Sequence, residues 1–442
     1  MKTLLYFLFF IFFLPGISNA QQESSQDSLF KVYSIDELFG LTIQNNQSLK
    51  ISASGLGIAK QGVEVAKNQR LPSVSTSLTA GYVGDALLIE KDFSKSTRVP
   101  MPHFANSFAL EASQLIFNGN AVNNTIASAS LQEQLAELDL EEDKLDIKLL
   151  VASNYFDLYK LYNQRGVYSK NIELAESRLS QIEKLYKQGM VTRNDLIRSQ
   201  LQIANLELAV EQINNDINIL NKQLTTATGL AESTNILPDT NILKRELQMS
   251  KLAEYQTEAQ LNYPSIKSAE VNNKLAEKGL QITKAERSPV LSLYAGNNLQ
   301  RPLTSSSPAV DMYSNGWQAG LRLSFNIGAL YTAPRDIKLS KLKLEQSRQF
   351  ELLERQNRSI TVNAAYIKYN EAISTAQTLE QNLSLANENY RIIEKKYLNQ
   401  LALIIDMLDA SNAKLEAELE RTNSEINILF THYKLQKEIG AL

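Results

Sequence analysis

The chain contains two versions of one motif, YKQGMVTRNDLIRSQ at residues 186–200 and YLNQLALIIDMLDAS at residues 397–411. When the two are superimposed, Asp195 lies over Asp406. In each version a short turn-like stretch separates two segments whose apolar residues recur with helical spacing. A motif that returns in this way indicates a duplicated structural unit, so the chain should consist of two similar halves.

The duplication extends toward the beginning of each half. NNQSLKIS at residues 45–52 aligns with NYPSIKSA at residues 262–269, and further along Pro72 aligns with Pro289. Both halves therefore share one order of elements: a helix, a pair of strands, a very long helix, a sharp turn and another helix.

Two segments predict helices that are far too long for a compact core. From residue 120 to residue 188 the chain has no proline and only one glycine, Gly166. The apolar residues of this segment follow the a and d positions of a heptad repeat: Leu131, Leu135, Leu138, Leu145, Leu149, Ala152, Phe156 and Tyr159. We expect long helices over residues 119–188 and 336–399, the first roughly 100 Å long at about 1.5 Å per residue. The chain should therefore be largely coiled coil.

Shorter helices flank the two long ones. The apolar spacing predicts helices over about residues 36–70 and 192–229 in the first half, and over about residues 257–287 and 404–438 in the second. In each half the two shorter helices together nearly match the long one in length. Short helices stacked end to end beside a long one would form a wall of uniform height.

A pair of strands is predicted ahead of each long helix. The expected strands cover residues 72–83, 104–117, 289–298 and 313–326. In the first strand Val74, Leu78 and Tyr82 share one face and serines occupy the other, so the sheet should have an apolar and a wet face. The loops over about residues 84–103 and 299–312 contain prolines and are expected to be mobile. A soluble antiparallel sheet would show the same alternation, so the pattern leaves the environment of the sheet open.

Four strands are too few to close a barrel. Unpaired strand edges are not tolerated in lipid, because hydrocarbon offers no partner for their backbone N–H and C=O groups. If these strands enter a membrane, copies of the chain must share the barrel. Two copies would supply eight strands and three would supply twelve.

The amino terminus predicts export. Lys2 precedes the apolar run TLLYFLFFIFFLPG, and a stretch of small residues ends at Ala20, as in a secretory signal peptide. A transmembrane anchor would need about 20 apolar residues, whereas this run breaks at Pro15. The expected divisions are a signal peptide over residues 1–20, a flexible segment over 21–33, a first repeat over 34–230, an equatorial linker over 231–256 and a second repeat over 257–440.

Composition and charge exclude several classes of function. The 45 basic and 48 acidic residues give no electrostatic footprint for nucleic acid. The chain has 0 cysteines, which excludes disulfides and a lipidated cysteine. Its 2 histidines, His103 and His432, belong to no metal-binding or catalytic motif. We therefore expect no enzymatic activity, no metal and no cofactor.

The duplicated helix, strand pair, long helix and GMVTRNDL-type turn resemble the TolC-like outer-membrane efflux proteins, also called outer membrane factors. The resemblance covers about residues 34–440. It implies a mainly α fold with a membrane β part: a homotrimer whose 12-stranded β-barrel lies in the outer membrane and continues as a 12-helix tube, or α-barrel, in the periplasm.

The resemblance also implies a function and partners. The family forms the passive exit duct of tripartite efflux or type I secretion systems, gated at its periplasmic tip. The implied partners are a periplasmic adaptor (membrane fusion) protein, an inner-membrane pump of RND or ABC type, and outer-membrane lipid.

Two carboxylates are assigned to the periplasmic aperture by the resemblance. IIDMLDA at residues 404–410 is similar to the LLDVLDA-type stretch that lines the closed aperture in the family, which places Asp406 and Asp409 there. Residues three apart share a helix face, so three copies would form two stacked acidic rings. Repulsion among six carboxylates would couple their titrations and favour cations. The alternative is that both are surface acids in the first turn of a helix, where the helix dipole favours them.

The contacts that the family uses at its tips are only partly present. By resemblance Gly189 forms the first tip, and Asp195 and Tyr397 take positions that hold neighbouring hairpins together in the closed tube. Asp195 would otherwise be a carboxylate at a helix start. At the second tip Gln400 and Ala402 stand where the family has glycine and arginine. A basic partner for Asp195 is missing there, so any lock on the closed state must use other contacts.

Two other functions fit the helical pattern. A periplasmic coiled-coil adaptor should contain more strands than the four predicted. A purely structural scaffold would not explain why strand pairs recur after Pro72 and Pro289.

Overall fold

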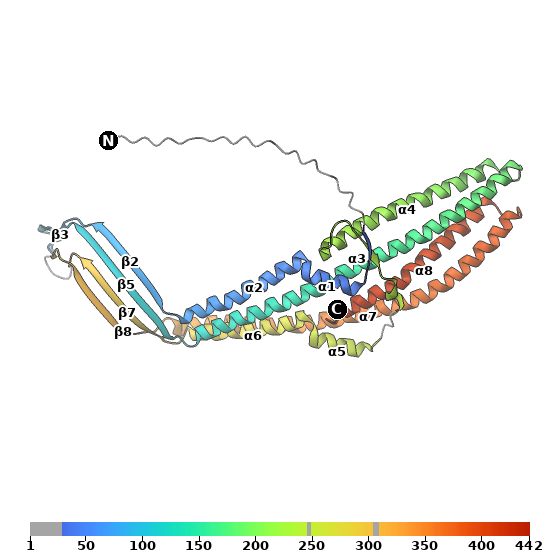
Figure 1. The fold of residues 1–442 in the computed structure, drawn as a ribbon. Helices are drawn as coiled ribbons and strands as arrows, with labels where there is room; N and C mark the ends of the chain where they lie inside the picture. The colour runs from blue at the N-terminus through green and yellow to red at the C-terminus, as the bar shows by residue number, and fades with distance from the viewer. Residues whose placement is uncertain (1–28, 245–248, 304–308) are drawn as a thin grey trace, which may run out of the picture.

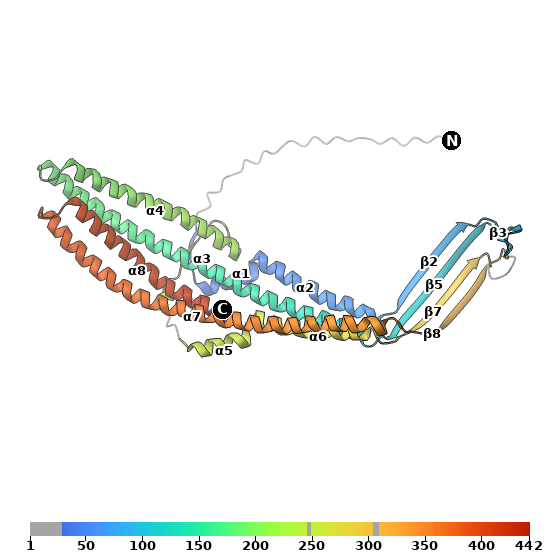
Figure 2. The same cartoon turned by 180° about the vertical axis from the view of Figure 1, so that it is seen from behind.

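The computed structural model describes residues 29–244, 249–303 and 309–442, and the molecule is strongly elongated (Figure 1). A β-sheet lies at one end, helical turns lie at the other, and helices run lengthwise between them, as the reverse view also shows (Figure 2). The expected signal peptide, residues 1–20, lies outside the described residues. Among the residues that are described, none of the helices combines the length and the apolarity needed to cross a membrane.

The sheet joins the two halves of the chain. It is antiparallel, with the strand order β2–β5–β7–β8. The four strands are β2 (Ser73–Tyr82), β5 (Phe104–Phe117), β7 (Val290–Arg301) and β8 (Ser314–Ser324). Each half contributes one hairpin, and the pairing of β5 with β7 fixes the hairpins to each other. Within the described residues, β2 and β8 are the open edges of this sheet.

The loop between β2 and β5, which we expected to be mobile over residues 84–103, contains regular secondary structure. It contains a second hairpin, formed by β3 (Ala86–Ile89) and β4 (Ser96–Val99). In its turn the Ser94 hydroxyl donates to the Asp92 carboxylate at 2.7 Å. The hairpin satisfies backbone groups that an irregular loop would leave to water, so the prolines nearby do not keep this loop unstructured.

Two long helices and four shorter ones form the wall. The long helices are α3 (Ala121–Lys187) and α7 (Ala329–Leu398), of 67 and 70 residues. Near the sheet they pack with α2 (Gln47–Lys67) and α6 (Pro264–Ala285) in the order α2–α3–α6–α7. Toward the other end they pack with α4 (Arg193–Thr228) and α8 (Ile404–Glu438) in the order α4–α3–α8–α7. At about 1.5 Å per residue each long helix spans about 100 Å and runs beside both levels.

Two helices that we expected to be continuous are broken at aligned positions of the duplication. α1 (Ile35–Asn45) is separated from α2 by Asn46, whose side chain accepts hydrogen bonds from two backbone N–H groups of the following turn. α5 (Leu252–Asn262) is separated from α6 by Tyr263, just before Pro264. Asparagine favours the N-cap position, and proline, which lacks an N–H group, begins a helix better than it continues one.

The second long helix begins before its expected start at residue 336. α7 starts at Ala329 and contains Pro334. A proline removes one helical hydrogen bond. Ala329 and Ala333 are buried, so packing of this first part of the helix offsets the missing bond.

Described parts of the expected flexible segment, residues 21–33, and of the expected linker, residues 231–256, pair with each other halfway along the molecule (Figure 1). β1 (Leu29–Tyr33) pairs in parallel with β6 (Thr234–Pro238). Residues 29–33 are therefore a strand and not part of a flexible segment. The two strands lie far apart in sequence, and local sequence patterns do not reveal such a pairing.

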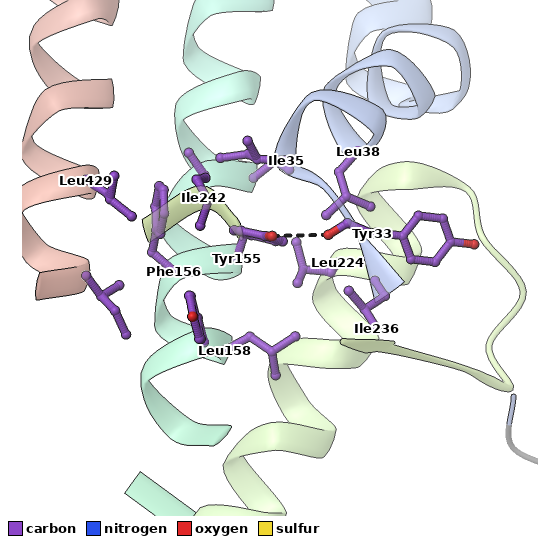
Figure 3. Close-up of a cluster of buried hydrophobic side chains, with 14 of the residues drawn as sticks. Tyr33, Ile35, Leu38, Tyr155, Phe156, Leu158, Leu224, Ile236, Ile242 and Leu429 are labelled. Atoms are coloured by element: carbon purple, nitrogen blue, oxygen red, sulfur yellow. Dashed lines mark hydrogen bonds between the residues drawn. The ribbon is translucent and has the colours of Figure 1, made fainter. Parts of the chain in front are cut away.

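The largest cluster of buried side chains surrounds this strand pair (Figure 3). Tyr155 and Phe156 of α3 are fully buried and pack with Tyr33 and Ile236 from the two strands. The Tyr155 hydroxyl donates to the Tyr33 carbonyl at 3.1 Å and accepts the N–H of Asp239 at 2.8 Å. Burial raises the pKa of Tyr155, so its hydroxyl keeps the proton that it donates.

Replacing Tyr155 by phenylalanine should destabilise this region, because the buried Tyr33 carbonyl and the partly buried Asp239 N–H group lose their shared partner. The expected loss in the free energy of unfolding is about 1–3 kcal/mol, measured by chemical denaturation of the purified protein. Tyr331→Phe removes the same hydroxyl from a side chain that is 69% exposed and should change little. Equal effects of the two substitutions would contradict this role of the Tyr155 hydroxyl.

Candidate aperture at the helical tips

Both long helices end in the same type of turn, at the end of the molecule farthest from the sheet (Figure 1). After α3, Gly189 has φ +73°, and the N–H group of the next residue donates to the carbonyl of Leu185 at 2.9 Å. After α7, Gln400 has φ 63°, and the N–H group of the next residue donates to the carbonyl of Lys396 at 2.8 Å. This is the Schellman geometry of helix ends. The duplication thus keeps the turn although glutamine has replaced glycine.

Asp195 caps the start of α4. Its carboxylate accepts the N–H group of Thr192 at 2.8 Å and the Thr192 hydroxyl at 3.0 Å, and its own N–H group donates to that hydroxyl at 3.3 Å. This reciprocal pair is a capping box. The second half keeps one side of it: the Asp406 carboxylate accepts the N–H group of Leu403 at 2.9 Å, but leucine has no side-chain oxygen to accept a bond in return. Both aligned acids therefore stabilise the start of a helix.

Asp406 and Asp409 are both exposed near the start of α8. Met407 and Ala410 beside them are buried, so the helix turns its apolar side to the neighbouring helices and its two acids away. Within the described part of the chain, Asp409 forms neither a hydrogen bond nor an ion pair, in contrast to the capping contact of Asp406. The structure brings the two predicted aperture acids onto one exposed face.

Tyr397 lies inside the tip and is 6% exposed. It packs with Ile182 of α3 and with Ile404 and Met407 of α8. Its hydroxyl has no hydrogen-bond partner in the part of the chain that the structure describes. Burial raises the pKa of Tyr397, and the Asp195 carboxylate raises it further. Tyr397 therefore makes no hydrogen bond to Asp195 and joins the hairpins through packing.

Sequence reasoning missed a buried arginine in the same region. Arg178 of α3 is 7% exposed. It was missed because arginine is rarely buried, so its residue type alone predicts a position on the surface. The available signal was its position on the buried heptad stripe that also contains Asn171, Ala175 and Ile182.

The sheet at the opposite end of the molecule has two different faces. One face forms a hollow of about 620 Å³ whose lining includes Glu111 of β5 and Arg322 of β8. The Arg322 guanidinium lies 4.8 Å from the centroid of the Tyr294 ring. The other face exposes large apolar side chains: Val74, Leu78, Leu110, Leu293, Trp317, Leu321 and Leu323.

Comparison with known proteins relates nearly the whole chain to one family. A family model described as outer membrane efflux protein matches residues 38–230 and 256–441. The outer membrane protein TolC of Escherichia coli is 22% identical, and the similarity covers 97% of this chain and 85% of TolC. The pyoverdine export outer membrane protein OpmQ of Pseudomonas putida is 23% identical, over 96% of this chain and 90% of OpmQ.

Solved structures have the same fold. The chain superimposes on the channel protein CusC with a TM-score of 0.77 at 15% identity, covering 96% of both chains. It superimposes on the outer membrane protein VceC of Vibrio cholerae with a TM-score of 0.73 at 14% identity, covering 92% of this chain and 96% of VceC. At these identities the likeness concerns the fold alone.

Replacing Gln400 by glycine should stabilise the second tip, because a left-handed conformation costs a residue with a Cβ atom about 1–2 kcal/mol. We expect slower native-state hydrogen exchange of the backbone amides around this turn, by about tenfold for 1.4 kcal/mol. Gly189→Gln is the matched reverse change at the first tip, where a Cβ atom meets nothing within 4 Å, and it should speed exchange there. If neither change alters exchange, the two turns do not have this geometry in solution.

Proposed function

The chain belongs to the outer membrane efflux protein family, and from this premise we propose that three copies of it form one exit duct. The chain is an outer-membrane channel protein with its helices in the periplasm. In the proposed assembly each copy supplies four strands of a 12-stranded barrel and four helices at every level of a 12-helix tube. The observation that carries the proposal is that, among the described residues, the sheet and both levels of the helical wall each end in two open edges.

The first pair of open edges belongs to the sheet. β2 and β8 are its outer strands within the described residues. Each unpaired backbone N–H or C=O group of an edge strand costs several kcal/mol in hydrocarbon. Pairing β2 of one copy with β8 of the next would satisfy these groups and close the sheet on itself. The exposed apolar face would then contact lipid, and the face with Glu111 and Arg322 would line the lumen.

The second pair of open edges belongs to the helical wall. α2 and α7 are the outer helices of the level next to the sheet. Exposed apolar residues on α2 recur every seven positions, at Ile51, Ile58 and Val65. A stripe of exposed apolar residues also runs along α7: Leu339, Leu342, Leu353, Ile360 and Ile367. Such spacing is typical of coiled-coil seams. The part of α7 beside α6 carries Leu339, Leu342 and Leu353, and because α2 and α7 are the outer helices of this level, these residues would meet the α2 stripe of the next copy.

At the far end we propose that Asp406 and Asp409 line the aperture of the tube. Both are exposed on one face of α8. Three copies would bring six carboxylates into a narrow passage, where their mutual repulsion couples their titrations and the field favours cations. Asp406 has a structural role, because one of its carboxylate oxygens accepts the capping bond. Asp409 makes no such contact in the described part of the chain, so helix capping does not explain a carboxylate at that position.

The proposed partners are a periplasmic adaptor at the tips and, behind it, an inner-membrane pump of RND or ABC type. Both tips expose apolar side chains: Met190, Leu398, Leu401, Leu403 and Ile405. Exposed apolar clusters of this kind are typical of protein docking sites. Because Gln400 and Ala402 replace the glycine and arginine of the family, the second tip would offer an adaptor an aliphatic surface in place of a basic one.

The double substitution Asp406→Asn and Asp409→Asn should lower the cation preference of the reconstituted channel several-fold, since six formal charges leave the aperture. Reversal potentials across planar bilayers under a salt gradient measure this preference. Glu254→Gln removes one exposed carboxylate per copy from α5, far from the tips, and should leave the reversal potential unchanged. An unaltered reversal potential in the double variant would reject the aperture assignment.

Ile58→Glu and Leu342→Glu should each weaken assembly, because a carboxylate buried in an apolar seam costs several kcal/mol. Native mass spectrometry in mild detergent should find mostly single chains for these variants. Leu261→Glu changes a side chain on α5 that is 67% exposed and lies outside both stripes, and it should assemble like the unmodified protein. Intact assemblies of both seam variants would contradict the proposed interface.

A further inference from the structure

The junction between the sheet and the helices carries basic residues that the duplication repeats. Figure 1 shows the ends of α2 and α6 and the starts of α3 and α7 together at one end of the sheet. Two cations of the first half align with two of the second, Lys67 with Lys284 and Arg70 with Arg287. Both arginines lie three residues before a strand begins, β2 in one half and β7 in the other. All four residues are exposed.

The start of α7 adds two more cations at this junction. Arg335 and Lys338 are exposed in its first three turns. The helix dipole favours cations at the C-terminal ends of α2 and α6, where Lys67 and Lys284 lie. It gives no reason for cations near the N-terminal end of α7. Helix stability therefore accounts for only part of this positive charge.

Most of these cations have no partner within the described residues. Lys67 forms an ion pair with Glu64 at 2.7 Å. Four other side chains form neither a hydrogen bond nor an ion pair in the part of the chain that the structure describes: Lys284, Arg287, Arg335 and Lys338. Only three acids lie among the six bases, Glu64, Glu286 and Asp336, so each copy keeps an excess of positive charge here.

Arg70 lies on the side of the sheet that is proposed to contact lipid. Gln114 of β5 pairs with Leu293 in the register of the sheet, so its side chain belongs to the apolar face. The Gln114 amide donates to the Arg70 carbonyl at 3.0 Å, which brings the Arg70 segment over that face. The Arg70 Nη2 atom donates to Asn123 Oδ1 of α3 at 2.9 Å. This single bond orients the guanidinium and leaves most of its N–H groups for another acceptor.

A small hollow of about 140 Å³ adjoins this guanidinium. Its lining combines Arg70 with the amide side chains of Gln69, Asn118 and Asn120, and with the ring of Phe117. Guanidinium and amide N–H groups are donors that suit phosphate oxygens. Phe117 ends β5 on the apolar face, and aromatic residues are enriched where such a face meets the lipid headgroups. The hollow therefore joins a wall that faces lipid to a set of N–H donors.

We infer that six basic residues, which we call the collar, bind the phosphate groups of anionic phospholipids in the periplasmic leaflet of the outer membrane: Lys67, Arg70, Lys284, Arg287, Arg335 and Lys338. This inference rests on the proposed function, in which the sheet spans that membrane. Each lysine or arginine near a surface of anionic lipid strengthens binding about fivefold. The headgroups would lie at the level where the strands end, which is where both halves keep their cations.

The test is native mass spectrometry of the full-length mature protein in mild detergent, titrated with dioleoylphosphatidylglycerol or with dioleoylphosphatidylcholine. The second lipid has the same chains and phosphate but no net charge. We expect phosphatidylglycerol to bind about tenfold more tightly. Replacing the four unpaired collar residues together, Lys284→Gln, Arg287→Gln, Arg335→Gln and Lys338→Gln, should abolish this preference. Arg70→Gln alone should weaken phosphatidylglycerol binding about fivefold.

A matched control removes as many positive charges from exposed positions on α3 and α4 toward the tips: Lys170→Gln, Lys184→Gln, Lys187→Gln and Arg193→Gln. This variant should keep the preference for phosphatidylglycerol. Inorganic phosphate at the concentration of the lipid should not displace phosphatidylglycerol, because it lacks the acyl chains that contact the apolar face. Displacement by inorganic phosphate would show a simple anion site and overturn the lipid inference.

The collar is also wrong if the unmodified protein shows no preference between the two lipids, or if the quadruple variant prefers phosphatidylglycerol as strongly as the unmodified protein does. Three-chain assemblies in the same spectra would then leave the proposed function intact. If the quadruple variant does not fold, Arg70→Gln decides the question alone. If only single chains appear, the proposed assembly fails, but the collar is still tested, because all six residues belong to one copy.

Discussion

Unpaired backbone groups along the outer sides of β2 and β8 set the constraint on which the rest of the structure depends. Lipid cannot satisfy them, and two hairpins are too few to satisfy one another in a closed ring. Because of the duplication, each helical level of the molecule also ends in two helices that lack a neighbour in the described part of the chain. Elements of the first half, β2, α2 and α4, form one side of every layer, while β8 and α7 of the second half form the other. One mode of association between copies would therefore close the sheet and both helical levels together.

The two halves show which parts of the duplicated design depend on backbone and which depend on side chains. The turn after each long helix is held by the same backbone hydrogen bonds although Gly189 corresponds to Gln400. The helix starts that follow differ, since Thr192 returns the bond of Asp195 and Leu403 cannot return that of Asp406. The halves have thus kept a common path of the chain while their tip surfaces have diverged.

Local signals in the sequence predicted the regular elements well. Strict alternation after Pro72 and Pro289 located the strand pairs, because the pleat of a strand places successive residues on opposite faces. The near absence of proline and glycine predicted the long helices. Signals confined to one residue were missed: the cap at Asn46 breaks a helix whose apolar spacing continues across the break.

Contacts between residues far apart in sequence could not be predicted either. β1 pairs with β6 across most of the first half, and Arg178 is buried only because three other helices bring acceptors to it. Neither the strand pairing nor the burial of Arg178 produces a local sequence signal stronger than the general preference of these residue types. The aperture acids, Asp406 and Asp409, were found by their likeness to a family motif, but a single chain contains only one third of the proposed ring.

Crosslinking between copies tests the central claim most directly, and the chain has 0 cysteines to interfere. Ser77→Cys on β2 and Gln318→Cys on β8 place thiols on the two edge strands. Within one copy these strands are three strand spacings apart, about 14 Å, so a shorter flexible crosslinker applied to intact outer membranes should join them only between copies. The account predicts a ladder on denaturing gels that ends at three chains. Single chains alone, with both thiols shown to be reactive, would contradict it.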